Sequence, residues 1–100
     1  MPEFSTPHSV KKADTKFTES EMIRSIRFAI ASEYEAIQIY EEMSENIDNK
    51  DAKTIIEEII TDEKVHVGNF LQLLKIIDPE EEKYYKEGYQ ETLDLLEKNK

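Results

Sequence analysis

Cysteine is absent from the 100-residue sequence, which excludes disulfide bonds and thiolate metal sites. Glycine and proline are scarce, at two and three residues. No run approaches the roughly 18 consecutive apolar residues of a membrane-spanning helix. The N-terminal residues also lack the apolar core of a signal peptide. We therefore expect a cytoplasmic protein that has no membrane partner.

Basic residues are also in short supply, since 13 Lys and Arg stand against 23 Asp and Glu, for a net charge of −10. Nucleic-acid binding requires a basic patch, so we expect no nucleic-acid partner. An acidic surface suits cations, although it is also an ordinary solvated surface. The few glycines and prolines and the abundant Glu, Lys, Ile and Leu predict an all-α fold.

Local signals divide the chain into a polar, aperiodic segment at 1–17, predicted to be a disordered arm, and one helical domain at 18–100. Thr18 with Glu21 three residues later is a capping box, which predicts the start of the first helix. The turn-forming segment N-I-D-N-K-D at 46–51 predicts a short loop. Helices joined by so short a loop are antiparallel neighbours, so the chain should form a helical hairpin.

The two later helix boundaries are also predicted from single residues. Asp51 is the expected N-cap of the second helix. Asp78 and Pro79 should end that helix and begin a shorter C-terminal one, with Asp78 as its N-cap and Pro79 in its first turn. Gly88 interrupts this last helix at a cost of about 1 kcal/mol and is an expected site of a kink or break.

Three polar residues occupy positions within two apolar seams. Both seams advance in steps of three and four residues, which is typical of helices that pack against another helix. The first contains Ile23, Ile26, Ile30, Glu33, Ile37, Tyr40 and Ile47, and the second contains Ile56, Ile59, Glu63, His66, Phe70, Leu73 and Ile77. Burying an unpaired carboxylate costs several kcal/mol, which a small domain can hardly tolerate without compensation.

Glu33, Glu63 and His66 should lie at one level of the hairpin. At 1.5 Å per residue, Glu33 lies roughly 24 Å from the turn, and Glu63 and His66 lie roughly 21 and 25 Å from it. Each residue alone could sit at a partly solvated edge of its seam. The coincidence of all three favours a metal site.

One chain supplies half of a familiar ligand set. A di-iron carboxylate bundle uses four helices, with a Glu from two of them and Glu-x-x-His from the other two. Two copies of the hairpin would complete this set as a four-helix bundle, and symmetric dimers are common. Oxygen and imidazole ligands suit Fe or Mn, and Zn less specifically.

Tyr40 lies two turns beyond Glu33 on the same face, where it is either a neighbour of the site or ordinary core. Glu35 lies on another face, where it is either a surface residue or part of a route by which cations enter.

Two segments have a pattern found in a known family. They are S-E-Y-E-A-I-Q-I-Y at 32–40 and D-E-K-V-H-V-G-N-F at 62–70, followed by D-P-E at 78–80. The pattern resembles that of the encapsulated ferritins, which are half-length relatives of ferritin and rubrerythrin. In layout the resemblance extends from about residue 18 to 97.

The resemblance implies a ferroxidase, in which two hairpins dimerise around a di-iron centre that oxidises Fe(II) to Fe(III). By resemblance, Glu33, Glu63 and His66 are the ligands, Tyr40 lies beside them, and Glu35 matches an acidic position near the metal's route. The implied cofactor is two Fe ions per dimer, with Mn, Zn or Ca as substitutes. The implied assembly is a ring of dimers, commonly a decamer, inside an encapsulin nanocompartment that stores the iron. The segment L-E-K-N-K does not resemble the family's shell-targeting peptide, which leaves open whether the chain is targeted or fused to a shell.

Two other functions remain open. One is a rubrerythrin-like peroxidase or another di-iron oxidoreductase, although without cysteine this chain has no rubredoxin-type electron donor. The other is a non-enzymatic helical assembly domain, for which metal would be dispensable.

Overall fold

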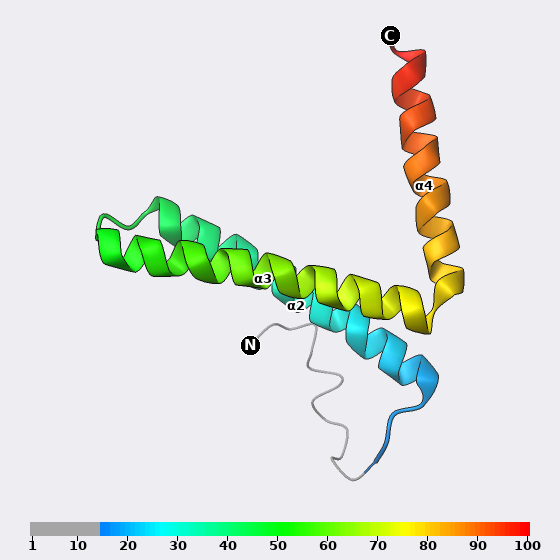
Figure 1. The fold of residues 1–100 in the computed structure, drawn as a ribbon, viewed down its shortest axis with the longest axis horizontal. Helices are drawn as coiled ribbons and strands as arrows, with labels where there is room; N and C mark the ends of the chain where they lie inside the picture. Colours follow the sequence, from blue (N-terminus) through cyan, green and yellow to red (C-terminus); the bar gives the residue numbers. More distant parts are fainter. Residues whose placement is uncertain (1–14) are drawn as a thin grey trace.

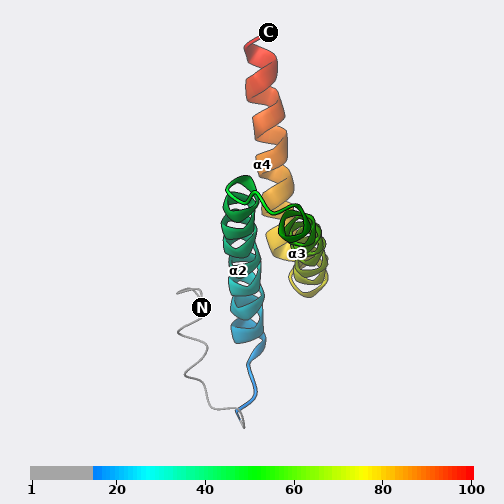
Figure 2. The same ribbon diagram turned by 90° about the vertical axis from the view of Figure 1, so that its left-hand side faces the viewer.

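Three helices and no strand make up the part of the protein that the computed structural model describes, residues 15–100. Helices α2 (Glu19–Glu45) and α3 (Lys50–Ile77) run antiparallel, side by side, and α4 (Pro79–Lys98) projects away from the end of α3 (Figure 1 and Figure 2). The predicted all-α hairpin with a shorter C-terminal helix is confirmed. Most of the expected disordered arm, residues 1–14, lies outside the described residues. None of these three helices has an apolar stretch long enough to span a membrane.

The hydrogen bonds at the helix ends agree with the predicted caps, with one exception. Thr18 and Glu21 form the reciprocal capping box, with bonds of 2.9 and 3.1 Å. Asp78 caps α4 by accepting from the Glu81 amide at 3.3 Å. The prediction of Asp51 as the cap of α3 was wrong. The chain is already helical from Lys50, and the cap is Asn49, which accepts from the Ala52 amide at 2.9 Å.

Helix α4 runs through Gly88 without a break, so a split helix at this position was the wrong expectation. Its glycine costs only about 1 kcal/mol relative to alanine, which is less than the cost of abandoning the hydrogen bonds of a helical turn. The Thr92 hydroxyl also donates to the Gly88 carbonyl at 3.0 Å.

The core of the chain lies between α2 and α3. Ile37 from α2 packs with Ile60 and Val67 from α3, and three partly buried apolar residues pack against them: Ile30, Tyr40 and Ile56. Leu74 is the most enclosed core side chain, at 3% exposed. No residue of α4 is buried. The hairpin is therefore the structural unit, and α4 is an appendage to it.

A single hairpin does not cover its own apolar surface. The radius of gyration is 17.6 Å, whereas a compact chain of this length has one of about 13 Å. Ile59 and Leu73 remain 37% and 41% exposed, and Ile55 remains 61% exposed. Ile59 follows Ile55 by four residues and Leu73 follows Ile59 by fourteen, so the three side chains lie on one face of α3. Such a face marks a surface available to a partner.

Three side chains connect α4 to α2 in what we call the Arg27–Glu81–Tyr85 clasp. The Arg27 guanidinium donates to both carboxylate oxygens of Glu81, with Nε lying 3.4 Å from Oε2. The Tyr85 hydroxyl donates to the same carboxylate. The hydrogen bond from Arg27, and then that from Tyr85, lower the pKa of Glu81. Burial and the Glu81 carboxylate raise the pKa of Tyr85 to about 12. Tyr85 therefore stays protonated and Glu81 stays charged at neutral pH.

Replacing Thr18 with alanine should destabilise the protein by about 1 kcal/mol, because the N-cap loses its side-chain acceptor. Thr18→Ser keeps that acceptor and is the matched control. Denaturant titrations of both variants would measure the difference in free energy of unfolding. Equal losses in the two variants would contradict the role of the capping box.

The clasp should give the stability a dependence on pH in the acid range. The folded protein lowers the pKa of Glu81. The stabilisation that the charged Glu81 carboxylate contributes is therefore fully present above the pKa of an unfolded Glu, about 4.3, and is lost as the pH falls through the lowered pKa of the folded state. The contribution should be at most about 1 kcal/mol, since Arg27 is 49% exposed.

Thermal melts of wild type and Glu81→Gln should therefore differ at pH 7 and converge in acid. A difference that persists undiminished below pH about 3 would contradict this origin.

Candidate metal centre

The hairpin brings Glu33, Glu63 and His66 together across its interface. Glu33 comes from the middle of α2, and Glu63 and His66 come from successive turns of α3. One ligand atom from each lies within 4.8 Å of the others. The level predicted from residue spacing is therefore the level observed. No other histidine or acidic residue of the described part joins the cluster.

The register of the two helices accounts for this meeting. Ile37 of α2 packs with Ile60 of α3, and the two lie at similar distances from the loop. In this antiparallel pair Glu33 lies four residues farther from the loop than Ile37, and Glu63 and His66 lie three and six residues farther from it than Ile60. The packing that fixes the register therefore also places Glu33 level with Glu63 and His66.

The distances within the cluster suit a shared cation. His66 Nδ1 lies 3.8 Å from Glu33 Oε2 and 3.7 Å from Glu63 Oε2. Two ligands that each bind one ion at about 2.1 Å are at most about 4.2 Å apart, so both distances are within range. The side chains of Glu33 and Glu63 are 20% and 21% exposed, which leaves little water to solvate two neighbouring negative charges.

One oxygen of the cluster is unsatisfied. Glu33 Oε2 is buried and has no hydrogen-bond partner. Leaving a buried acceptor of this kind unpaired costs about 1–3 kcal/mol, and more when it is charged. A cation bound between the carboxylates would compensate for this cost. The residues present therefore fit a metal ion of the type that carboxylates and imidazole bind, such as Fe or Mn.

The centre formed by one chain is open on one side. The side chain of His66 is 49% exposed, although it belongs to the same cluster as two largely covered carboxylates. Ile59 and Leu73 lie two turns before and after His66 on the same exposed face of α3. The metal cluster therefore borders the apolar surface that the hairpin leaves uncovered.

The two remaining sequence candidates lie outside this cluster. Tyr40 packs against the core formed by Ile37, Ile60 and Val67, so its core role is observed and a role beside the metal remains a prediction. Glu35 does not belong to the cluster, because two residues along a helix turn the side chain by about 200°. Its place on a cation route is likewise a prediction.

The sequence reasoning did not foresee the Arg27–Glu81–Tyr85 clasp. Arg27 and Glu81 are separated by 54 residues, and no local pattern links them. Taken by itself, Glu81 is only one of three acidic residues in the first turn of α4.

Comparison with known proteins places the chain in a family. The model of the rubrerythrin family matches residues 25–100. The chain is 34% identical over 82 residues to a ferritin-like–encapsulin shell fusion protein of Pyrococcus furiosus, covering 82% of this chain and 24% of that protein. It is 35% identical over 88 residues to the encapsulin nanocompartment cargo protein EncC of Myxococcus xanthus, covering 88% of this chain and 66% of that protein. The chain thus spans about a quarter of the first relative and just under two thirds of the second.

A solved structure agrees with the family match. The crystal structure of the encapsulated ferritin domain from Pyrococcus furiosus superposes with a TM-score of 0.80 at 32% sequence identity, covering 87% of this chain and 89% of that one. At this identity the likeness extends to the ferritin-like helical fold as a whole. The chain belongs to the rubrerythrin family of ferritin-like proteins.

Proposed function

We propose that the protein is a ferroxidase, which binds Fe(II) at a site shared by two copies of the chain and oxidises it to Fe(III). The observation that supports this most strongly is the meeting of Glu33, Glu63 and His66 around an unsatisfied carboxylate oxygen. Membership of the rubrerythrin family supports an oxidoreductase that uses two iron ions.

The number of ligands favours a shared site. One chain offers two carboxylates and one imidazole, whereas a di-iron bundle takes four carboxylates and two imidazoles. A second hairpin related by a two-fold axis supplies the other half with the same three residues. Ile59 and Leu73 flank His66 with exposed apolar side chains. These side chains give the dimer an interface in which to bury apolar surface.

The carboxylates, the imidazoles and the iron would each contribute differently to the chemistry. The four carboxylates of the dimer balance the charge of two Fe(II) ions, and the neutral imidazoles complete the coordination without adding charge. Bound at this site, two Fe(II) ions would each give up one electron, and dioxygen would accept both electrons and two protons to become hydrogen peroxide. Glu33, Glu63 and His66 of the two chains would hold the two ions close together.

We further propose that the dimers assemble into a ring, with ten chains as the expected size, and that the ring works inside a cytoplasmic encapsulin nanocompartment that stores the oxidised iron. The names of the two relatives, one fused to an encapsulin shell and one carried as cargo, support this partner. The elongated shape of the chain supports assembly, since one copy leaves much apolar surface uncovered.

A second candidate is a rubrerythrin-like peroxidase, which the family match favours. It would use the same ligands and differ in the oxidant. Mixing the Fe(II)-loaded protein with dioxygen or with hydrogen peroxide in a stopped-flow instrument separates the two. Oxidation that is faster with dioxygen supports the ferroxidase, and oxidation that proceeds only with peroxide supports the peroxidase.

Removing a ligand should slow iron oxidation. We expect His66→Ala and Glu63→Gln each to lower the initial rate of Fe(II) oxidation, followed by absorbance, by at least about tenfold. Asp62→Asn is the matched control, because it removes a neighbouring exposed carboxylate outside the cluster. Wild-type rates in both ligand variants would show that these residues do not hold the iron.

Iron should be bound by pairs of chains. In native mass spectrometry at micromolar concentration, we expect iron on dimers and on multiples of dimers, with two ions per dimer. Leu73→Asp places a charge on the exposed face of α3 and should shift the protein towards monomers that carry no iron. Iron held by wild-type monomers would contradict the shared site.

A further inference from the structure

The joint between α3 and α4 consists of one residue. Asp78 follows the last residue of α3 and precedes the first residue of α4. Its amide donates to the Leu74 carbonyl at 2.8 Å, and its side chain caps α4. The direction of α4 therefore depends on few backbone dihedral angles, because Pro79 has a fixed φ and restricts the residue before it. A small rotation at Asp78 would move the far end of a 20-residue helix a long way.

Apolar packing does little to fix that direction. No residue of α4 is buried, and the apolar side chains of its outer half are more than half exposed: Leu93 at 60%, Leu95 at 62% and Leu96 at 55%. Tyr84 and Tyr89, which lie closer to the joint, are 65% and 63% exposed. The hydrophobic effect therefore offers little resistance to movement of α4 as a rigid body.

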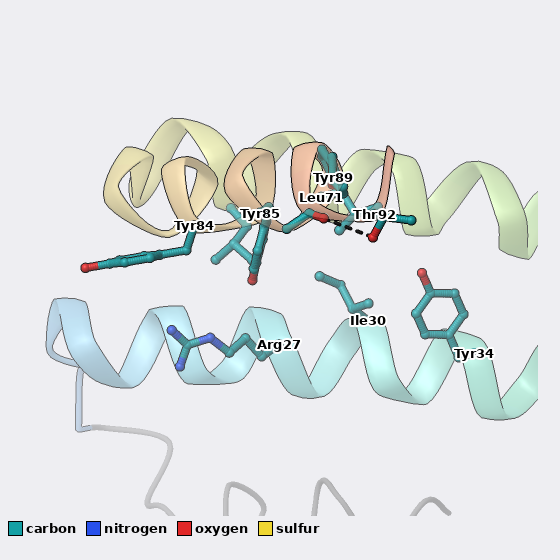
Figure 3. Close-up of a pocket in the computed structure, with 10 residues that line it drawn as sticks. Arg27, Ile30, Tyr34, Leu71, Tyr84, Tyr85, Tyr89 and Thr92 are labelled. Atoms are coloured by element: carbon teal, nitrogen blue, oxygen red, sulfur yellow. Dashed lines mark hydrogen bonds between the residues drawn. The ribbon is translucent and has the colours of Figure 1, made fainter. Parts of the chain in front are cut away.

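A hollow of about 660 Å³ separates the first half of α4 from the hairpin (Figure 3). Ile30 and Tyr34 line it from α2, Leu71 lines it from α3, and Tyr84 and Tyr89 line it from α4. These facing side chains are mostly apolar or aromatic. Because the hollow keeps these side chains apart, packing across it does not fix the direction of α4.

The Arg27–Glu81–Tyr85 clasp is placed to fix this direction. Glu81 lies in the first turn of α4, its side chain is only 13% exposed, and it accepts hydrogen bonds from Arg27 of α2 and from Tyr85 one turn later. An Arg–carboxylate pair with two donors is directional, because the planar guanidinium and carboxylate must lie in one orientation. The Tyr85 hydroxyl donates to Oε2, the same carboxylate oxygen that Arg27 Nε approaches. Together the three side chains form a contact of defined geometry between α2 and α4, which otherwise barely touch.

We propose that the Arg27–Glu81–Tyr85 clasp is a conformational lock that sets the direction of α4 relative to the hairpin. Arg27 and Glu33 are six residues apart, so they lie about 120° apart around α2 and on different faces. Opening the lock should therefore change where α4 points without disturbing the metal cluster. The inference does not rest on the proposed ferroxidase activity, since the direction of α4 can be measured in the absence of iron.

The test is an electron–electron distance measurement between nitroxide labels. The sequence has no cysteine, so Lys53→Cys on α3 and Glu91→Cys on α4 accept labels at those two exposed positions only. Doubly labelled chains are diluted into an excess of unlabelled chains, so that distances within one chain dominate. With the lock intact, we expect a single narrow distance distribution. Glu81→Gln and Arg27→Met should each broaden it or shift it to shorter distances.

The matched control is Glu80→Gln, which removes a carboxylate one residue away. Glu80 pairs with Lys83 of the same helix at 3.5 Å, so this change leaves α2 uninvolved and should leave the distribution as in wild type. The double reversal Arg27→Glu with Glu81→Arg should restore a narrower distribution than either single reversal gives. Tyr85→Phe removes one hydroxyl only and should broaden the distribution even if the charge variants lose helix content by circular dichroism.

Distributions of Glu81→Gln, Arg27→Met and Tyr85→Phe that superimpose on wild type would overturn the lock. Iron oxidation by Glu81→Gln is measured in parallel and should match wild type. A failure of the ferroxidase proposal would appear in that assay for wild type as well, and would leave the distance result intact.

Discussion

The packing of Ile37 against Ile60 and Val67 is the contact on which the rest of the site depends. It fixes the register of α2 against α3, and a shift of one turn would separate Glu33 from Glu63 and His66 by about 5.4 Å. The apolar core and the polar cluster are thus set by the same interlocking of side chains. The core stabilises an arrangement in which one carboxylate oxygen is buried without a partner, a cost that a bound cation would offset.

A two-helix hairpin is too thin to enclose its own apolar residues, and this limit links the chemistry to assembly. The side chains buried within one chain form a narrow line between α2 and α3, while other apolar residues of α3 remain exposed beside His66. The metal cluster lies at the edge of that line. A partner that covers the exposed face would therefore bury apolar surface and complete the ligand set in one step.

The clasp and the metal cluster use different faces of α2 for different purposes. Arg27 and Glu33 project from different faces of α2, so the contact that orients α4 is separate from the contacts that hold metal. Their energetics differ as well. The metal cluster brings like charges together in a poorly solvated place. The clasp joins opposite charges near solvent, where the net stabilisation is modest and the hydrogen bonds are directional.

Sequence alone determined the features that depend on neighbours within a few residues, namely the helix periodicity, the Thr18 and Asp78 caps and the Glu63–His66 spacing. It also predicted the level of Glu33 opposite that pair, because a short loop makes two helices antiparallel and the distance of each residue from the loop then sets its height. Local prediction was wrong at Asn49, where two nearby residues could both cap a helix, and at Gly88, where helix continuity outweighed a weak propensity. Only the tertiary structure decided the direction of α4 and the pairing of Arg27 with Glu81. These depend on the backbone angles of one joint residue and on side chains 54 positions apart, and no periodic pattern in the sequence encodes either.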